Sequence, residues 1–327
     1  MPRRGPLQRF YRSIPPLHRA IRFLKNAATY WLARFAIWLV GLLPLKRALA
    51  LGDHTGTVLY HLLRQPRRLA LEHLELVFGD RLSAAQRQDI ALAAFQNSAR
   101  CFCEAAKLDE IRPHFEEYVT VEGWEHAEAI LAGQRGAIAV TGHIGNWELL
   151  AAYFAHKGLP VTAIANRIHS HSLNTLVIEF RARNGVRTIV RQSRSSAREI
   201  VRVLHHRGIL AMLVDQDVKR TPSVSVPFFG HNARTPVAAA RLAIRLNIPL
   251  VAAFCQRRPD GGQRLQILPP LPHPHSGDPD QDVIELTRRI NHVLEEQIIS
   301  HPEQWVWWHR RWRRAPVPRL DLDPEFP

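Results

Sequence analysis

Cysteine is scarce in this sequence, and acidic residues are too few to balance the basic ones. Only Cys101, Cys103 and Cys255 occur among 327 residues. An odd number of cysteines at these spacings provides neither a disulfide framework nor a metal-binding cluster, so we predict a reducing cytoplasmic setting, no bound metal and no cofactor. The 44 Lys and Arg against 29 Asp and Glu leave a formal charge of +15. We therefore expect an anionic partner, either a nucleic acid or an anionic membrane.

An apolar stretch that approaches the length of a membrane span occurs near the N-terminus. Residues 27–45 read AATYWLARFAIWLVGLLPL, close to the roughly 20 residues that cross a bilayer, but Arg34 lies inside the stretch and Pro44 near its end. Three interpretations are open: a transmembrane helix, a helix lying in the membrane interface with Trp31 and Trp38 at headgroup level, or a buried helix of a soluble protein. No small-residue cleavage site follows the stretch, so we expect no removed signal peptide.

The chain divides into an N-terminal segment, a helical part and an α/β part. We expect a basic segment with a membrane-associated helix over 1–51, and the helical periodicity predicts a helical cap over 52–118, with Ser83 as an N-cap. From 119 to 327 short apolar runs alternate with amphipathic ones. This alternation predicts an α/β fold with a mostly parallel sheet flanked by helices and functional loops at the carboxyl ends of the strands. The expected strands are 137–141, 161–166, 186–190, 209–216, 249–256 and 264–269, and the expected helices are 147–158, 172–184, 195–207, 235–247 and 281–300.

The sharpest local motif is TGHIGNWELL, residues 141–150, where the first of these expected strands ends and a helix begins. Five residues rotate an ideal helix by about 140°, so His143 and Glu148 cannot share one helical face. They meet if His143 lies in the loop, Gly145 allows a sharp turn and Asn146 caps the helix. Glu148 would then fix the tautomer of His143 and stabilise its protonated form, which suits a general base for a hydroxyl. The alternative for this spacing alone is a structural histidine.

The motif resembles the H-x4-D/E active-site motif of the glycerolipid acyltransferase superfamily. The closest similarity is to the lipid A secondary acyltransferases, the lauroyl and myristoyl transferases, and to the related phosphatidylinositol mannoside acyltransferases. Asn166 and Ile168 depart from the family pattern, which has Tyr and Pro at these positions, close to the expected acceptor pocket. Further blocks are similar in the same order: NRIHSHSLNTLVIEFRARNG (166–185), LVDQDVKRTPSVSVPFFGHNARTPVAAARLA (213–243) and PEQWVWWHRRWRR (302–314).

The resemblance implies a glycerolipid acyltransferase-like fold and an O-acyltransferase on the cytoplasmic side of the bacterial inner membrane. The donor would be an acyl thioester, usually acyl carrier protein. The acceptor would be an anionic lipid, the hydroxyl of a 3-hydroxyacyl chain on a lipid A precursor. His143 would remove the proton from that hydroxyl, and either backbone N–H groups of residues 142–145 or Arg167 would hold the oxyanion. This chemistry needs no covalent acyl-enzyme.

Arginines and aspartates in the similar blocks are the candidate substrate-binding residues. Arg167 occupies the position of the arginine in the family's Tyr-Arg-Pro motif, where it would bind an acceptor phosphate or polarise the thioester carbonyl. Arg181 is preferred to Arg183 because the two point to different faces of a helix. Asp215 and Asp217 follow a buried strand, where catalytic carboxylates collect in α/β folds, although capping of the loop is an equal alternative.

The tail WVWWHRRWRR, residues 305–314, interleaves tryptophan with arginine. This composition suits a membrane interface with anionic headgroups, and we expect Arg310 and Arg311 to bind the anionic part of the lipid acceptor. The rival interpretation is stacking and charge neutralisation along a nucleic acid strand. An apolar N-terminal stretch and an H-x4-E loop have no purpose in such a protein, so we expect no nucleic acid partner. Phe228 and Phe229 are expected either to line an acyl groove or to pack in the core.

Overall fold

The computed structural model describes residues 16–166, 170–191, 195–218 and 221–312, without the side chains of residues 16–25 and 171. Within these ranges the chain forms a seven-stranded sheet in the order β1-β9-β8-β2-β5-β3-β4 and a separate hairpin, β6-β7. The pairings in the large sheet are parallel except that between β8 and β9, so the expected mostly parallel α/β sheet is confirmed. The strands are β1 (Val119–Glu122), β2 (Ala137–Thr141), β3 (Val161–Ala165), β4 (Arg187–Val190), β5 (Ile209–Leu213), β6 (Ser223–Phe228), β7 (His231–Pro236), β8 (Leu250–Arg257) and β9 (Gln263–Ile267).

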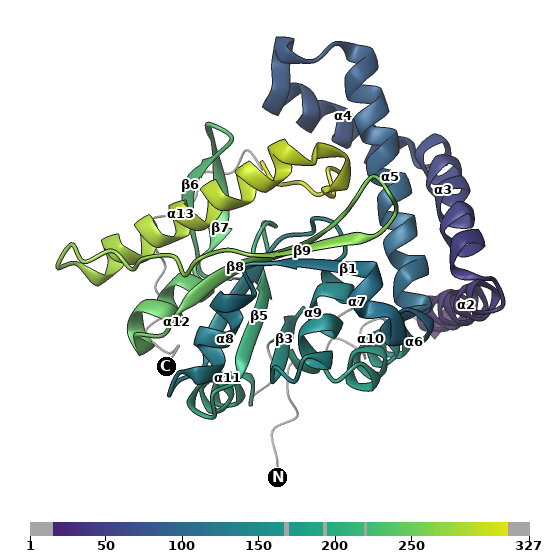
Figure 1. The fold of residues 1–327 in the computed structure, drawn as a ribbon. Coiled ribbons are helices and arrows are strands. Elements are labelled where there is room, and N and C mark those ends of the chain that lie inside the picture. Colours follow the sequence, from purple (N-terminus) through teal and green to yellow (C-terminus); the bar gives the residue numbers. More distant parts are fainter. Residues whose placement is uncertain (1–15, 167–169, 192–194, 219–220, 313–327) are drawn as a thin grey trace.

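Helices cover both faces of the large sheet, because alternate residues of each buried strand point to opposite faces. Ile138 and Val140 of β2 belong to the cluster that includes α11, α12 and α13, whereas Ala137 and Ala139 belong to the cluster that includes α8 and α9 (Figure 1). The helices of these two layers are α8 (Trp124–Ala132), α9 (Trp147–His156), α10 (His171–Arg183), α11 (Ser196–His205), α12 (Ala238–Leu246) and α13 (Pro279–Ser300).

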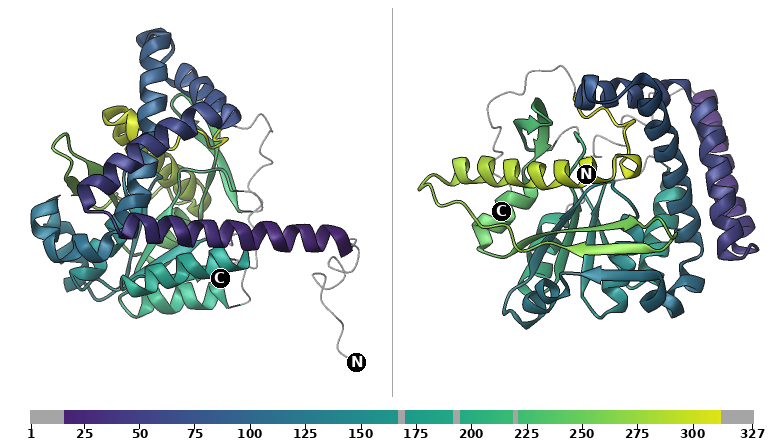
Figure 2. Two further views of the ribbon diagram at one scale, coloured as in Figure 1. Left: turned by 90° about the vertical axis from the view of Figure 1, so that its right-hand side faces the viewer. Right: turned by 45° about the horizontal axis from the view of Figure 1, so that its top comes forward.

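The N-terminal helices stand beside the sheet as a further layer, with α2 lying against α5 and α10 (Figure 2). Ser83 caps α5 in a reciprocal capping box with Gln86, which confirms the expected N-cap. Helices α3 and α5 approach closely at Gly56, where a Cβ atom would lie 2.4 Å from the Cα of Gln96. Only glycine permits this approach. The elements are α2 (Pro16–Gly41), α3 (Leu45–Leu62), α4 (Arg64–Phe78), α5 (Ala84–Ala106), α6 (Leu108–Ile111) and α7 (Phe115–Tyr118).

Some elements differ from the sequence prediction. The expected helix over 235–247 begins later, because residues up to Pro236 form β7 and pair with β6 across the turn at Phe229 and Gly230. Strand β1 and helix α8 were not expected, and the division into parts at residues 51 and 118 stays a prediction. Among the described residues, no helix combines the length and the apolar character that crossing a membrane requires.

Candidate active site

The loop that carries His143 begins where β2 ends and closes with the first turn of α9. Gly145 has φ of +58°, and a Cβ atom at this position would lie 1.9 Å from the carbonyl oxygen of Cys255. The side chain of Asn146 accepts a hydrogen bond from the backbone N–H of Leu149 at 3.0 Å and caps α9. The expected glycine turn and asparagine cap are therefore confirmed, and they place His143 outside the helix at the carboxyl edge of the sheet.

His143 pairs with Asp215. Its Nδ1 atom lies 2.8 Å from Oδ1 of Asp215, and its backbone N–H donates to Oδ2 at 2.9 Å. The indole N–H of Trp305 donates to the same Oδ2 at 2.9 Å. Strands β2 and β5 are adjacent and parallel, with Thr141 opposite Leu213, so the residues that follow these strands lie side by side. The structure thus gives His143 a different carboxylate from the one that the sequence analysis expected.

The Asp215 carboxylate is buried and ionised. Its side chain is 1% exposed, whereas that of His143 is 25% exposed. Burial raises the pKa of Asp215, but the charge and hydrogen bonds of His143 and the hydrogen bond from Trp305 outweigh it and bring this pKa to about 2. An anionic Asp215 at neutral pH holds the His143 ring in one orientation and leaves the other ring nitrogen toward solvent or substrate.

Glu148 pairs with Arg181 instead of His143. Two nitrogens of the Arg181 guanidinium donate to the two oxygens of Glu148, at 3.0 Å from Nε and 2.5 Å from Nη2. The two side chains are 20% and 12% exposed, respectively. Glu148 lies in the first turn of α9 and faces α10, because the helix turns its side chain away from the loop. Arg181 thus contacts Glu148, whereas Arg183 lines the apolar pocket beside it, so the preference for Arg181 stays a prediction.

An apolar pocket opens beside this pair. It has a volume of about 580 Å³ and lies between α2, α5, α9 and α10. Trp147 lines the pocket and also contacts the His143 ring edge to face, with ring centroids 4.9 Å apart. Trp147 therefore links the wall of the pocket to the candidate base. Its apolar wall includes Ala33, Ile37, Phe102, Leu176 and Phe180.

The chain matches a family model described as bacterial lipid A biosynthesis acyltransferase over residues 15–314. It belongs to this family. Curated relatives include a phosphatidylinositol mannoside acyltransferase of Mycobacterium tuberculosis, 26% identical over 194 residues, and the match covers 59% of this chain and 59% of the relative. The lipid A biosynthesis lauroyltransferase of Escherichia coli is 26% identical, covering 88% of this chain and 92% of the relative. The E. coli lipid A biosynthesis palmitoleoyltransferase is 27% identical, covering 90% and 94%.

Gln304, Trp305, Trp307 and Arg311 of the C-terminal family block are buried, which corrects the expectation for Arg311. The Arg311 side chain donates to the backbone oxygen of Arg234 at 2.6 Å and to Oγ1 of Thr235 at 2.7 Å, and its guanidinium lies 4.5 Å from the Phe228 ring centroid. Burial lowers the pKa of Arg311 to about 10. These contacts attach Arg311 to the β6-β7 hairpin. The Arg311 side chain is 0% exposed, so it does not face an acceptor headgroup.

Other expected site residues have mixed outcomes. Arg310 is exposed, whereas Arg167 lies outside the described residues. Asp217 is buried, its backbone N–H donates to Nε2 of His309 at 3.1 Å, and its carboxylate lies 3.9 Å from Nη1 of Arg234. Phe228 is fully buried and packs edge to face against Trp305, so it belongs to the core and not to an acyl groove.

Several backbone N–H groups of the His143 loop already donate to other groups of the protein. They are therefore not available to hold the oxyanion, contrary to the expectation from the sequence analysis. Those of His143, Gly145 and Asn146 donate to Asp215, Gln304 and Cys255, respectively.

The sequence analysis missed two contributors to the site, Trp305 and the pairing of Asp215 with His143. Neither gave a local signal, because Trp305 is 90 positions from Asp215 and meets it only in the folded chain. Among the described residues, no group of three His, Cys, Asp or Glu side chains gathers that could hold a metal ion.

Proposed function

We propose that this protein transfers a fatty acyl chain from an acyl thioester, such as acyl carrier protein, to a hydroxyl of a lipid acceptor. A 3-hydroxyacyl chain of a lipid A precursor is the first candidate acceptor. The observation that carries the proposal is the His143–Asp215 pair beside an apolar pocket of about 580 Å³. Family membership and the names of the E. coli relatives support it. Another membrane glycolipid, as the name of the mycobacterial relative indicates, is the second candidate acceptor.

In the proposed mechanism His143 is the general base. With the Nδ1 proton donated to Asp215, Nε2 removes the proton of the acceptor hydroxyl as its oxygen attacks the thioester carbonyl. Asp215 stabilises the imidazolium that forms. The tetrahedral intermediate then collapses, the carbon–sulfur bond breaks, and His143 returns the proton to the leaving thiolate. Arg181 is proposed to act on substrate binding through Glu148, which lines the apolar pocket and accepts two hydrogen bonds from Arg181.

The acyl chain of the donor is proposed to occupy the apolar pocket. A fatty acyl chain needs an apolar channel that starts at the reacting carbonyl, and Trp147 joins the pocket wall to the His143 ring. Phe102 and Phe180 supply flat walls for such a chain. Purified protein incubated with acyl carrier protein charged with a lauroyl chain and micelles of a lipid A precursor is expected to yield an ester-linked product that is heavier by one acyl group. Mass spectrometry detects it, and no product with any tested lipid acceptor contradicts the proposal.

The acceptor headgroup is proposed to lie near Arg310. This exposed side chain lines a pocket of about 480 Å³ together with Arg64 and Arg68, and Arg68 also pairs with Glu72. An apolar groove of about 490 Å³ shares Trp308 with that pocket, so anionic and apolar parts of one lipid fit side by side.

Arg310→Lys tests this assignment, because lysine keeps the charge and removes the paired hydrogen bonds that a guanidinium makes to phosphate. The acceptor KM is expected to rise several-fold, on the order of 10-fold, with kcat for saturating acceptor kept. An unchanged acceptor KM would remove Arg310 from the acceptor site.

Helix α2 is proposed to lie in the membrane interface. Trp31, Phe35 and Trp38 are 66%, 55% and 58% exposed on this helix. Large exposed apolar side chains on an amphipathic helix are typical of interfacial binding, and the net charge of +15 adds attraction to anionic lipid. The pocket between α2, α5, α9 and α10 would then open close to the lipid from which the acceptor comes.

Replacing Trp31, Phe35 and Trp38 together with glutamine is expected to weaken binding to phosphatidylglycerol vesicles by about 1,000-fold or more, because each buried aromatic side chain contributes about 1.5 to 3 kcal/mol and about 1.4 kcal/mol is tenfold in affinity. Vesicle sedimentation measures this. The matched control replaces Leu131 and Ile299, which are 42% and 50% exposed elsewhere on the surface, and should bind as the wild type does. Equal losses in both variants would show that binding does not depend on α2.

A further inference from the structure

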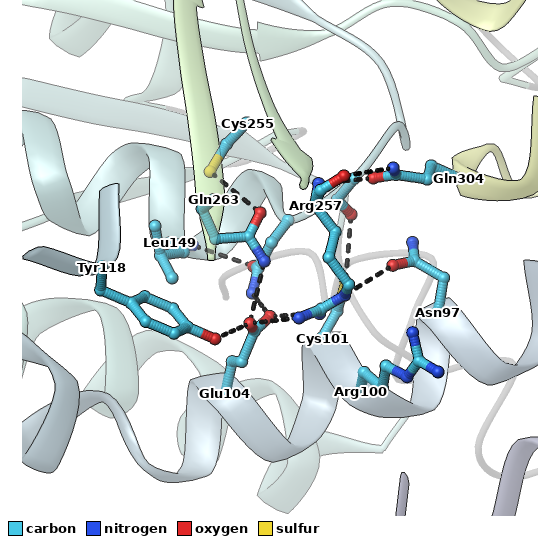
Figure 3. Close-up of polar contacts among 12 residues, drawn as sticks. Asn97, Arg100, Cys101, Glu104, Tyr118, Leu149, Cys255, Arg257, Gln263 and Gln304 are labelled. Carbon is cyan, nitrogen blue, oxygen red and sulfur yellow. Dashed lines mark hydrogen bonds and ion pairs between the residues drawn. The ribbon is translucent and has the colours of Figure 1, made fainter. Parts of the chain in front are cut away.

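A buried ionic network lies behind the His143 loop, centred on Glu104 of α5 (Figure 3). Both nitrogens at the tip of the Arg257 guanidinium donate to the two Glu104 oxygens at 2.8 Å. Tyr118 and Gln263 donate to the same carboxylate, at 2.5 Å and 2.8 Å. The Glu104 side chain is 0% exposed and that of Arg257 is 8% exposed. The network joins α5 to the ends of β8 and α7 and to the start of β9.

Stability alone does not explain this pair. Removing two charges from water costs as much free energy as their attraction returns, so apolar side chains of similar size would fill the same space at least as well. The Arg257 guanidinium nevertheless keeps its charge. Burial lowers the pKa of Arg257, but the adjacent Glu104 carboxylate raises it by more, so that the result lies above its usual range. An ionic network in a core fixes the relative positions of the elements that carry its side chains, because each hydrogen bond requires a defined geometry between donor and acceptor.

The network reaches the loop at two points. Asn146 Nδ2 donates to Glu104 at 2.8 Å, while its Oδ1 caps α9. The side chain of Gln304 holds the backbone of Arg257 with two hydrogen bonds, at 2.8 Å and 2.9 Å, and its own backbone oxygen accepts the N–H of Gly145 at 2.9 Å. Gly145 and Asn146 are thereby tied to one ion pair, and both directly follow Ile144, which itself bridges to Trp305.

We propose that the Glu104–Arg257 pair positions the His143 loop for catalysis through two connections, one made by Asn146 and the other by Gln304. These four are positioning residues, since none of them contacts the reacting atoms in the proposed mechanism. The inference rests on the proposed acyl transfer with His143 as base. A base that must reach a hydroxyl proton tolerates little displacement, because a misplacement of about 1 Å can lower the rate about 100-fold.

Asn146→Ser separates positioning from folding. Serine keeps an oxygen for the N-cap of α9 but lacks the amide nitrogen that reaches Glu104, whose hydrogen bonds from Arg257, Tyr118 and Gln263 remain. We expect kcat to fall roughly 10- to 100-fold with KM for both substrates close to that of the wild type, and the thermal unfolding midpoint to fall about as far as in Tyr118→Phe, since each variant loses one hydrogen bond to Glu104. Gln304→Ala removes the two hydrogen bonds between the Gln304 side chain and the Arg257 backbone and leaves the ion pair intact. It is expected to lower kcat in the same way.

Tyr118→Phe is the matched control, because it removes one hydrogen bond to the same carboxylate from α7, away from the loop. It should unfold at a lower temperature and keep its kcat. A wild-type kcat in both Asn146→Ser and Gln304→Ala overturns the proposal, and so does a Tyr118→Phe variant that loses as much kcat as they do. If the wild-type protein transfers no acyl group to any lipid, the proposed function fails instead, so the two failures are distinguishable.

Discussion

Replacing His143 with alanine is expected to lower kcat for acyl transfer by about 100-fold or more, because general base catalysis contributes about that much or more to the rate. The ring is 25% exposed and lies in a loop, so its removal leaves the sheet and its packing in place. Product formation by mass spectrometry measures the loss. Vesicle binding should be unchanged, and the variant should still fold with a lower thermal unfolding midpoint, because Asp215 loses its partner. His114→Ala, at a side chain that is 65% exposed on the short segment before α7, is the control and should retain wild-type turnover. Near-normal turnover in His143→Ala would exclude His143 as the base.

Asp215→Asn is expected to lower kcat by roughly 100- to 10,000-fold with the fold retained. Oδ2 of Asp215 accepts hydrogen bonds from the His143 backbone and from Trp305, so the amide oxygen of asparagine must take that position. Its amide nitrogen then faces Nδ1 of His143 and can only donate. The histidine proton moves to Nε2, which is the atom that must accept the proton of the acceptor hydroxyl.

Glu148→Gln is the informative comparison for Asp215→Asn. Glu148 holds Arg181, so its substitution should act through substrate binding and lower kcat less than Asp215→Asn does. Steady-state kinetics of both variants with the same donor and acceptor decides between them. If Glu148→Gln proves the more damaging, Glu148 acts on His143 in a state that these contacts do not represent, and the base and its partner must be reassigned.

The local features of the site were predictable because they depend on neighbours in the chain. The strand over 137–141, the turn at Gly145 and the cap at Asn146 follow from side-chain size and backbone freedom within a few residues. The choice between Glu148 and Asp215 was not local. Glu148 is five residues from His143, but the order of strands in the sheet brings Asp215 closer.

Arg310 and Arg311 show in the same way that local sequence does not decide which side chains are buried. A run of tryptophan and arginine has one composition whether it lies at a membrane surface or in the core, so the sequence could not separate Arg310 from Arg311. In the structure Arg310 is exposed, whereas Arg311 lies under the β6-β7 hairpin with hydrogen bonds to Thr235 and to the backbone of Arg234. That hairpin was itself not predicted. Because the buried partners of Arg311 belong to it, the burial of Arg311 could not be predicted either.

The sequence by itself determined the α/β class, most of the strands and the loop that presents the proposed base, because hydrophobic periodicity and turn chemistry act over a few residues. Only the tertiary structure decided the partner of His143, the burial of Arg311 and the link from Glu104 and Arg257 to the loop. Each of these is a contact between segments far apart in the chain. Such contacts depend on strand order and packing direction, which a single sequence leaves open, and a buried charge is stable only where the fold supplies its partner.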